Sequence, residues 1–354
     1  MNNRGLEGVV AAETRLSHVD GERGELILAG YRIDDLAPNA AFEEVVWLLW
    51  NGELPEEREL ASFRRELASR RSCEVSRAPG VEPLDAIRML LPPGDDPLEI
   101  VAKFPTIIAA VWRLSRNQRP IAPDPSLGHA ANYLYMLTGE VPPGEKVRAL
   151  ETYLNTVVDH GLNASTFTAR VITSTGSDLV SAIVGAVGAL KGPLHGGAPG
   201  PALDMVFEIG DAARAEEYLR GKIEAGEKLM GFGHRVYKVR DPRADVLAAA
   251  AEQLFARGGD RSLYSLARAV EQEALRLLEQ YKPGRRLQTN VEFYTALLLH
   301  GIGLDVPLFT PTFAVSRVAG WLAHSLEQRA ANRLIRPQSE YVGPRGRTWT
   351  APAA

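Results

Sequence analysis

Cysteine is nearly absent from this sequence of 354 residues, which contains only Cys73. A single thiol cannot form a disulfide within the chain, and it cannot supply the several ligands of a cysteine-based metal cluster. The lack of a disulfide is typical of proteins that work in a reducing compartment. We therefore expect a cytoplasmic protein without a metal cluster of this kind.

Long apolar runs are also missing. The apolar segment Val180–Leu190 is short and is followed at once by Lys191, whereas a membrane-spanning helix needs about 18 or more apolar residues. The segment Met1–Ala12 is interrupted by Arg4 and Glu7 and lacks the apolar run of a signal peptide. The sequence therefore predicts neither a membrane span nor a secretion signal.

The chain has no strong excess of charge of one sign. It contains 40 lysines and arginines against 44 aspartates and glutamates, which gives a formal net charge of −4. This balance indicates no general affinity for nucleic acid or for an anionic membrane. The length is sufficient for one large core or for two domains of unequal size. Basic residues are therefore expected to act at local sites.

Strand-like alternation is scarce, and its best example is Glu25–Tyr31, which follows the turn Asp20–Gly24. Helical periodicity dominates the rest of the chain. No self-similarity with a period of 30 to 45 residues is present, which disfavours a helical solenoid. We predict an all-α protein with one possible short N-terminal β-hairpin and with helices at residues 42–50, 57–69, 98–114, 129–137, 145–158, 177–190, 212–225, 245–257, 262–281, 291–300 and 312–334.

Glycine and proline concentrate in two segments, Gly192–Pro201 and Gly231–His234. Glycine costs about 1 kcal/mol and proline about 3 kcal/mol inside a helix, so both segments are predicted loops. Each loop carries a histidine, His195 or His234. Glycines beside a histidine allow the backbone to approach a ligand closely, although a histidine hydrogen-bonded within a turn explains His195 equally well.

Four cationic residues follow His234 within nine positions: Arg235, Lys238, Arg240 and Arg243. One interpretation is a solvated run of charge. Clustered guanidinium groups beside a histidine and open backbone suit an anionic small molecule better. The Gly-x-Gly of this loop lacks the preceding strand and the third glycine of a dinucleotide-binding motif.

Two further residues could carry chemistry on predicted helices. Glu292 would lie in the first turn of a helix capped by Asn290, where the helix dipole favours the ionised carboxylate. Arg317 lies in an otherwise apolar helix, and a buried guanidinium needs an anionic partner. Taken alone, Glu292 is explained by its position in the dipole and Arg317 by an ion pair within the protein. A substrate could also be the partner of Arg317.

Together these segments resemble the citrate synthase family. The motifs that carry the resemblance occur in the family's order over nearly the whole chain. They are Gly5–Val9 with Asp20-Gly21, Asp159–Thr166, Gly192–Gly197, Gly231–Tyr237, Asn290–Tyr294 and the tail Arg317–Gly343 with Arg336-Pro337. The chain is similar to the shorter bacterial and archaeal type of the family.

The resemblance implies an all-α homodimer whose small domain closes over the substrates. By motif, residues 1–197 and 301–354 are expected to form the large helical domain from both chain ends, and residues 198–300 the small domain. The junctions would fall at Gly196–Pro201 and His300–Gly303. Closure would exclude water during the reaction.

The resemblance also implies a reaction, the condensation of acetyl-CoA with oxaloacetate. His195 would hold the thioester carbonyl, His234 the ketone of oxaloacetate, and Glu292 would be the base in place of the family's usual aspartate. Further matching positions are His160, Arg243, Arg317 and Arg336 for oxaloacetate, with Arg336 reaching the neighbouring subunit's site, and Gly231, Gly233, Arg235, Lys238 and Arg240 in the region that meets coenzyme A. No metal or cofactor is implied.

Two alternatives remain open from the sequence. The same chemistry with propionyl-CoA would make the chain a 2-methylcitrate synthase, because one methylene in an apolar pocket is worth only about 1–3 kcal/mol. A helical dimer with weak catalysis and a binding or regulatory role is the other alternative. The glutamate at position 292 keeps it open, because the family's usual residue is an aspartate.

Overall fold

The computed structural model describes residues 4–6, 8–75, 80–195, 200–258 and 260–349, and helices make up most of it. The first part of the chain and its end contain α1 Ile33–Leu36, α2 Phe42–Asn51, α3 Glu57–Ser69, α4 Pro83–Leu90, α5 Pro97–Ser115, α6 His129–Thr138, α7 Gly144–Val157, α8 Ala164–Ser174, α9 Leu179–Leu190 and α15 Phe309–Ala330. Between α9 and α15 lie α10 Gly200–Ile209, α11 Ala215–Glu224, α12 Pro242–Arg257, α13 Arg261–Tyr281 and α14 Val291–Ile302. Short 3-10 turns occur at Arg4–Leu6, Ala212–Arg214 and Val306–Leu308.

The strands in the described residues form one small antiparallel sheet, in the order β1 Ser17–Asp20, β2 Glu25–Leu28 and β3 Tyr31–Arg32. Ser17 pairs with Leu28 and Asp20 with Glu25. The prediction of an all-α fold with a short N-terminal hairpin is therefore confirmed. The sheet also has a third strand of two residues.

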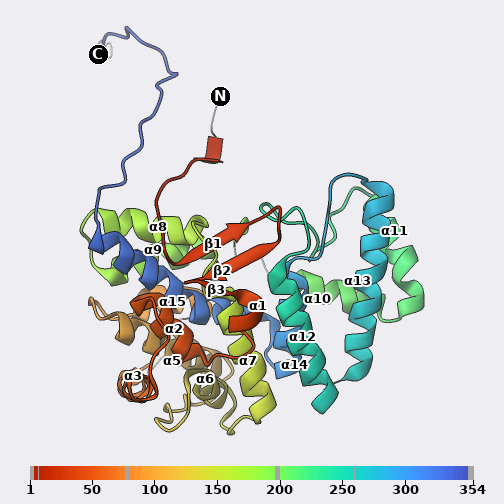
Figure 1. The fold of residues 1–354 in the computed structure, drawn as a ribbon, viewed down its shortest axis with the longest axis horizontal. Helices are drawn as coiled ribbons and strands as arrows, with labels where there is room; N and C mark the ends of the chain where they lie inside the picture. Colours follow the sequence, from red (N-terminus) through yellow and green to blue (C-terminus); the bar gives the residue numbers. More distant parts are fainter. Residues whose placement is uncertain (1–3, 7, 76–79, 196–199, 259, 350–354) are drawn as a thin grey trace, which may run out of the picture.

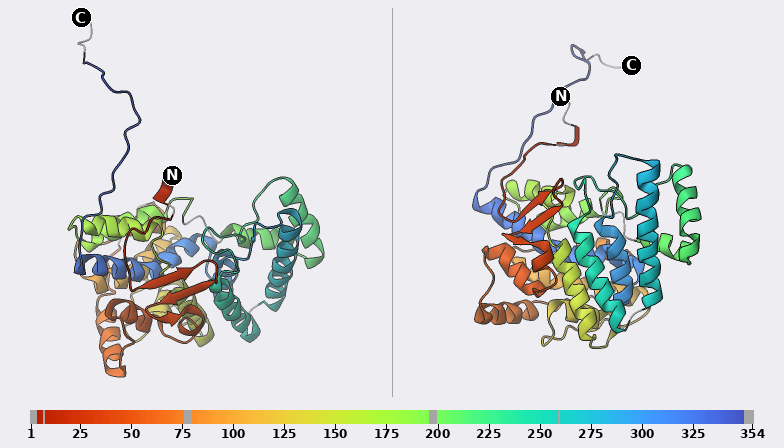
Figure 2. Two further views of the ribbon diagram at one scale, coloured as in Figure 1. Left: turned by 45° about the horizontal axis from the view of Figure 1, so that its top comes forward. Right: turned by 45° about the vertical axis from the view of Figure 1, so that its right-hand side comes forward.

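The helices form two groups on either side of the molecule. Figure 1 shows α10 to α13 on one side, with α2, α3, α5 to α9 and α15 on the other. The further views in Figure 2 keep this arrangement. Helix α12 contacts both α7 and α14, and α14 contacts α7, so these helices join the groups. The proposed domain boundaries stay a prediction, and the first, between residues 197 and 198, lies outside the described residues.

Three helix starts position residues that matter below. Asn163 caps α8 by accepting from the Thr166 amide at 3.1 Å. Asp241 caps α12 and accepts from the amide at position 243 at 3.0 Å. Asn290 caps α14, as predicted, and accepts from the Glu292 amide at 2.9 Å. Each such cap stabilises its helix by about 1 kcal/mol.

Helices α1, α4, α8 and α10 were not expected from the sequence. Helix α8 is rich in serine, threonine and β-branched residues, which have low helix propensity, and its packing against α9 and α15 compensates. Helix α10 begins at Gly200-Pro201, inside a segment predicted as a loop, because proline is tolerated in the first helical turn. Packing against neighbouring helices therefore determines that these segments are helical.

Helix α15 is deeply buried, and most of its side chains from Phe309 to Ser325 are inaccessible to solvent. At Gly320 an added Cβ would overlap the carbonyl oxygen of Val158, so glycine lets α15 approach the end of α7.

No single described helix is long and apolar enough to cross a membrane. Helix α14 and the segment Val306–Ala330 would together be long and apolar enough, but the two are bent by 117° relative to each other.

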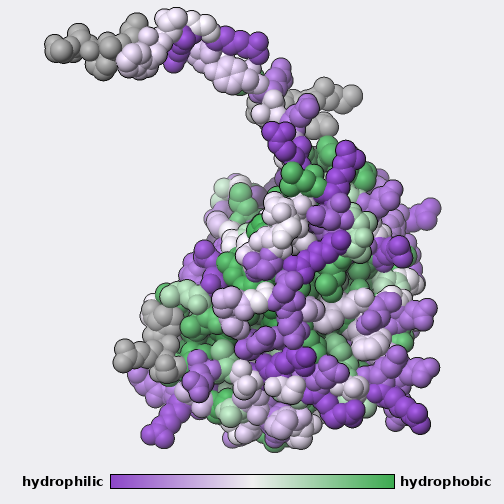
Figure 3. All heavy atoms as spheres, turned by 90° about the vertical axis from the view of Figure 1, so that its left-hand side faces the viewer, coloured by the Kyte–Doolittle hydropathy of each residue, from purple (hydrophilic) through white to green (hydrophobic). Residues whose placement is uncertain are grey.

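The segment after α15 leaves the body of the protein in an extended conformation (Figure 1). In the space-filling view it stands clear of the remaining surface (Figure 3). Its apolar side chains are exposed, with Tyr341 at 59%, Val342 at 90% and Trp349 at 85% of full accessibility.

A second cluster of buried polar groups lies away from the loops discussed above, where α2 meets α6. His129 is fully buried, stacks on Phe42 with ring centroids 5.1 Å apart, and donates its backbone amide to Glu43 at 2.8 Å. Neither ring nitrogen has a hydrogen-bond partner among the described residues. Burial, assisted by the charge of Arg71, lowers the pKa of His129 to about 3. The imidazole is therefore neutral in the folded protein.

This pKa predicts a specific loss of stability in acid. The unfolded chain binds a proton near the ordinary pKa of 6.5 while the folded chain does not, so stability is full above pH 6.5 and falls as the pH drops towards 3. We expect His129 to cost about 2 kcal/mol between pH 7 and pH 5. The measurement compares urea unfolding at both pH values in the wild type and in His129→Phe. An equal pH dependence in the two proteins would contradict the prediction.

Candidate active site

Six of the residues predicted from the sequence line one inner cavity of about 210 Å³. They come from distant segments: the loop after α7, the loop after α9, the loop before α12, and the helices α12, α14 and α15. The six are His160, His195, His234, Arg243, Glu292 and Arg317. The cavity opens into a larger outer cavity of about 1310 Å³ that shares His160, His195, His234 and Glu292. The sequence thus predicted which residues gather, although not how they are held.

The ring of His195 is fixed by the start of α8. The Ser165 amide donates to Nε2 of His195 at 3.3 Å, and the Ser165 hydroxyl lies 2.8 Å from the same nitrogen. An amide can only donate, so Nε2 carries no hydrogen and Nδ1 does. Burial, assisted by the charge of Arg317, lowers the pKa of His195. The result is a neutral imidazole with a free Nδ1–H donor.

Sequence reasoning missed Ser165, although it lies inside a motif that was recognised. Its hydroxyl oxygen also lies 2.8 Å from Oδ1 of Asn163 and accepts from the indole N–H of Trp321 at 3.1 Å. The side chain is fully buried. A serine in the first turn of a helix looks like an ordinary capping residue, so no signal in the sequence separated it from its neighbours.

His234 has the opposite tautomer. The amides of Val236 and Tyr237 donate to its Nδ1 at 3.1 and 3.0 Å, so the hydrogen lies on Nε2. The Arg243 Nη2 atom is 3.3 Å from that nitrogen. Because a guanidinium cannot accept a hydrogen bond, two donors meet at this point. Burial and then Arg243 lower the pKa of His234 to about 4, and the pair is arranged for an oxygen acceptor.

Arg243 and Arg317 are held in different ways. Arg243 makes a bidentate contact with buried Asp241, at 3.0 Å from Nε and 2.8 Å from Nη2. Arg317 is only 2% exposed, donates from Nε to the Val157 carbonyl at 2.6 Å, and lies over the Phe313 ring at 4.5 Å. No carboxylate of the described residues lies within ion-pair distance of its guanidinium, although the more distant charge of Asp159 acts to raise its pKa.

The environment of Arg317 bears on the two interpretations left open by the sequence. Burial lowers its pKa to about 10, which leaves the guanidinium charged at neutral pH. A buried cation without an anionic partner is costly, and a bound anion removes that cost. The structural ion pair suggested as the simpler interpretation is not formed in the described residues. The arrangement favours a carboxylate ligand in the inner cavity.

Glu292 is half-buried in the first turn of α14. Burial raises its pKa, and Arg243 only partly offsets this. The expected contribution of the helix dipole favours the ionised form, whereas the loss of water on burial acts in the opposite direction. A carboxylate with a raised pKa is a better proton acceptor.

His160 lies between the loops of the site. Its Nε2 is 3.1 Å from the hydroxyl of Tyr237, and its ring centroid is 5.7 Å from that of His234. Burial first, then the charges of Arg243 and Arg317, lower the pKa of His160 well below its ordinary value. All three histidines of the cavity are therefore neutral.

The loop of His234 is clamped to the segment before α14. Phe232 and Thr289 form an antiparallel bridge, and the Gly233 amide donates to the Gln288 carbonyl at 2.7 Å. Gly231 has φ +86, and an added Cβ there would press on Phe293 at 2.9 Å. Glycine is required at this position by both conformation and space. The clamp fixes His234 relative to Glu292.

Some residues expected near coenzyme A do not reach a cavity. Gly231, Gly233 and Arg235 line the outer cavity. The Arg240 guanidinium instead contacts Asp245 and buried Glu271, the latter at 2.6 Å. Lys238 donates from Nζ to the Arg235 carbonyl at 3.2 Å. Arg336, which was expected at oxaloacetate and not at coenzyme A, is exposed on the tail.

Other cations line the outer cavity in place of Lys238 and Arg240. They are Lys228, Lys282 and Arg285. Lys282 and Arg285 flank Pro283-Gly284 in the turn after α13. A basic turn of this kind was visible in the sequence, but its distance from the histidine loops hid its relation to them.

The sequence of this chain is similar to those of known enzymes. The family model described as "Citrate synthase, C-terminal domain" matches residues 5–338. The chain belongs to the citrate synthase family. It is 41% identical to a citrate synthase of Haloferax volcanii over 98% of this chain and 97% of that protein. It is 42% identical to a 2-methylcitrate synthase of Mycobacterium tuberculosis over 96% and 90%.

Solved structures of citrate synthases share the whole fold. The enzyme from Thermotoga maritima matches with a TM-score of 0.88 and 37% identity over 99% of this chain and 98% of that one. The citrate synthase from Thermoplasma acidophilum, solved as a ternary complex with carboxymethyl coenzyme A and oxaloacetate, matches with a TM-score of 0.86 and 32% identity over 99% of this chain and 98% of that one. The predicted family, fold and enzyme class are confirmed.

The tautomers and low pKa values in this citrate synthase family member are directly measurable. At pH 7, ¹⁵N NMR of histidine-labelled protein should show a neutral His195 protonated on Nδ1 and a neutral His234 protonated on Nε2. His234 should titrate near 4, and His195 should titrate below its ordinary pKa of 6.5. Spectra of His195→Gln and His234→Gln assign the signals. Opposite tautomers, or a His234 pKa near 6.5, would contradict the geometry.

Proposed function

We propose that this chain condenses acetyl-CoA with oxaloacetate to give citrate and free coenzyme A. The observation that carries the proposal is the inner cavity, where two neutral histidine donors and one carboxylate lie with the buried, unpaired Arg317. Neutral donors stabilise developing oxyanions, and the arginines suit a small dicarboxylate. Thiol release that depends on both substrates tests the proposal. Its absence in folded protein would refute it.

In the proposed reaction Glu292 removes a proton from the acetyl methyl group. The thioester oxygen, which gains negative charge in the enolate, accepts from Nδ1–H of His195. The enolate carbon then attacks the ketone carbon of oxaloacetate. The alkoxide that forms accepts a hydrogen bond from Nε2–H of His234, and its protonation balances the proton that Glu292 removed. Water finally cleaves the thioester bond, which gives citrate and the thiol of coenzyme A. Each oxygen that gains negative charge in this sequence accepts a hydrogen bond from a histidine of the chain.

Oxaloacetate is proposed to bind first to the cations of the inner cavity. Arg317 offers terminal N–H groups for one carboxylate, and Arg243, fixed by Asp241, offers its guanidinium beside Nε2–H of His234. The close approach of those two donors suits a keto acid, whose ketone and carboxylate oxygens lie side by side. His160 lines the same cavity and would complete the contacts.

Coenzyme A is proposed to occupy the outer cavity. Lys228, Arg235, Lys282 and Arg285 line it, and clustered cations bind phosphate groups through charge-assisted hydrogen bonds. Because the cavity shares His195 and Glu292 with the inner one, a thioester could extend from the phosphates to the reacting groups. This assignment replaces Lys238 and Arg240 of the sequence-based expectation.

Propionyl-CoA is the alternative acyl donor. The chain is about equally similar to a citrate synthase and to a 2-methylcitrate synthase, at 41% and 42% identity. The inner cavity has apolar walls at Val157, Leu190, Val291 and Phe313, and one methylene changes binding by only about 1–3 kcal/mol. The ratio of kcat/KM for the two thioesters decides between them.

A homodimer is also part of the proposal. The tail beyond α15 is extended, and Tyr341, Val342 and Trp349 are exposed in the single chain. A second subunit would cover these residues and could receive Arg336.

The small domain of residues 198–300 is proposed to close over bound oxaloacetate. Light scattering of the full chain tests the dimer, and the cytoplasmic location stays a prediction from the sequence.

The role of Glu292 gives a sharp prediction. Glu292→Gln keeps shape but cannot accept a proton, so turnover should fall by about 10²–10⁴, and deuterium exchange at the acetyl methyl should stop. Glu292→Asp should stay active but impaired. Because the base must be ionised and its pKa is raised, kcat should fall with decreasing pH at a higher pH than for an ordinary carboxylate.

The matched control for this test is Glu145→Gln, in the first turn of α7 outside both cavities. It should leave turnover and exchange unchanged. Exchange at the wild-type rate in Glu292→Gln would assign the base to another residue.

The outer cavity gives a second prediction. Arg285→Ala removes a cation from its wall, and a lost charge-assisted contact should raise the KM for acetyl-CoA about tenfold or more. The KM for oxaloacetate should not change. The neighbouring Arg286, which faces Glu22 at 3.7 Å, provides the control Arg286→Ala. Equal effects of the two variants on KM for acetyl-CoA would argue against the proposed phosphate site.

A further inference from the structure

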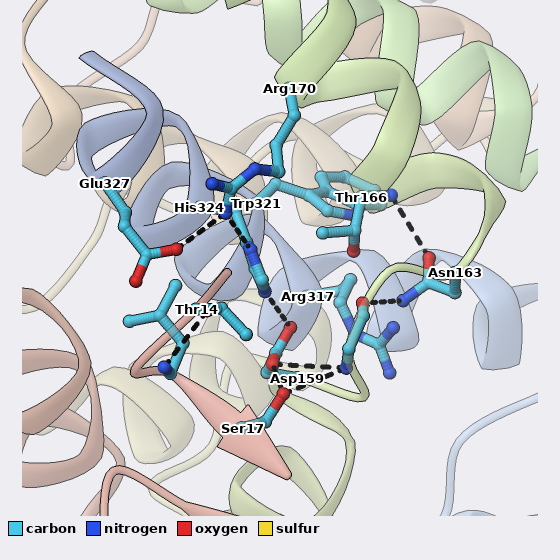
Figure 4. A network of polar contacts seen from close by, with 12 residues as sticks. Thr14, Ser17, Asp159, Asn163, Thr166, Arg170, Arg317, Trp321, His324 and Glu327 are labelled. Atoms are coloured by element: carbon cyan, nitrogen blue, oxygen red, sulfur yellow. Dashed lines mark hydrogen bonds and ion pairs between the residues drawn. The ribbon is translucent and has the colours of Figure 1, made fainter. Parts of the chain in front are cut away.

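A buried chain of polar contacts lies behind the inner cavity. Figure 4 shows His324 of α15 between Arg170 of α8 and Asp159, which precedes His160. Arg170 Nη1 is 2.8 Å from Nδ1 of His324, and Nε2 of His324 is 3.1 Å from Oδ1 of Asp159. His324 and Asp159 are fully buried, and Arg170 is 3% exposed. None of these residues lines either cavity.

The direction of these hydrogen bonds is fixed by the chemistry of arginine. A guanidinium can only donate, so Nδ1 of His324 must accept and Nε2 must carry the hydrogen. His324 is therefore neutral and donates to Asp159. The charge of Arg170 is balanced by Glu327 at 2.7 Å. An imidazolium at this position would bring two N–H groups together, which makes the neutral form part of the structure.

Asp159 and Ser17 hold the backbone on both sides of His160. The Ser17 hydroxyl donates to Oδ2 of Asp159 at 2.5 Å. The Gly161 amide donates to the Ser17 oxygen at 3.0 Å and lies 3.4 Å from the same Asp159 oxygen. Gly161 has φ +59, which turns the chain directly after His160. The position of the His160 ring therefore depends on where the Asp159 carboxylate is anchored.

Helix α15 touches this loop at several points besides His324. Arg317, about two helical turns before His324 and thus on the same face, donates to the Val157 carbonyl. Gly320 allows close approach to Val158. Trp321 donates to Ser165, which holds His195. One face of the helix thus carries Arg317 and also contacts the segments that carry the two histidines.

We propose that His324 is a positioning residue that locks the loop of His160 to α15 through Asp159, and so sets the distance between His160 and Arg317 for oxaloacetate. It acts without touching the substrate. The inference rests on the proposed function, because oxaloacetate is the ligand whose binding it controls. Without His324, the buried Arg170 and Asp159 are no longer connected, and the loop of His160 shifts. A displacement near 1 Å can lower the reaction rate about a hundredfold.

The test compares His324→Leu with His324→Gln. Leucine breaks both contacts, so the KM for oxaloacetate should rise about ten- to hundredfold, while the KM for acetyl-CoA at saturating oxaloacetate should change less than about twofold. The glutamine amide can accept from Arg170 and donate to Asp159, so it should restore the KM to within about threefold. The control is Ser325→Ala, a buried serine on α15 whose hydroxyl has no partner among the described residues.

Ser17→Ala is the milder second variant if His324→Leu fails to fold. It removes one donor to Asp159 and the acceptor for Gly161, and should raise the KM for oxaloacetate about three- to tenfold. A lower melting temperature with an unchanged KM for oxaloacetate in the folded variants would show a purely structural role and overturn the inference. Wild-type protein that releases no thiol would instead refute the proposed function, so the two failures are distinguishable.

Discussion

The site depends on one constraint: cationic and hydrogen-bond-donating groups are gathered in a space from which water is largely removed. Burial lowers the pKa of His195 and His234 and keeps both rings neutral. A neutral imidazole has one donor and one acceptor, so each ring is useful only if its acceptor is occupied from behind. Backbone amides at Ser165, Val236 and Tyr237 do this. The positions of α8 and of the loop before α12 follow from that need.

The buried charges impose a second requirement on the fold, because each must be held in place at low dielectric. Asp241 serves both as cap of α12 and as partner of Arg243. Arg317 is held by a carbonyl group and an aromatic ring instead of a carboxylate, which leaves its charge available. This asymmetry distinguishes the two arginines. One is oriented by the protein alone, and the other becomes fully compensated only with an anion bound.

Much of the site could be predicted because its residues lie in loops with glycine and in short motifs. The helix capped by Asn290 was also readable, since capping is a local property. What could not be read depends on contacts between distant segments. Ser165 and the basic turn at Arg285 acquire their surroundings only when the chain folds, and Arg240 is drawn away by Glu271. Helix α8 likewise forms through packing that outweighs its weak propensity.

The meeting of Nε2–H of His234 with the guanidinium of Arg243 at 3.3 Å has a consequence for inhibitor design. Two donors that face each other repel, and their strain is relieved by a small anionic oxygen placed between them. A compound that offers a carboxylate or oxyanion there should gain from both groups at once. An alcohol or amine would bring a further hydrogen into the same space. Selectivity among such compounds would thus follow charge and acceptor count more closely than overall shape.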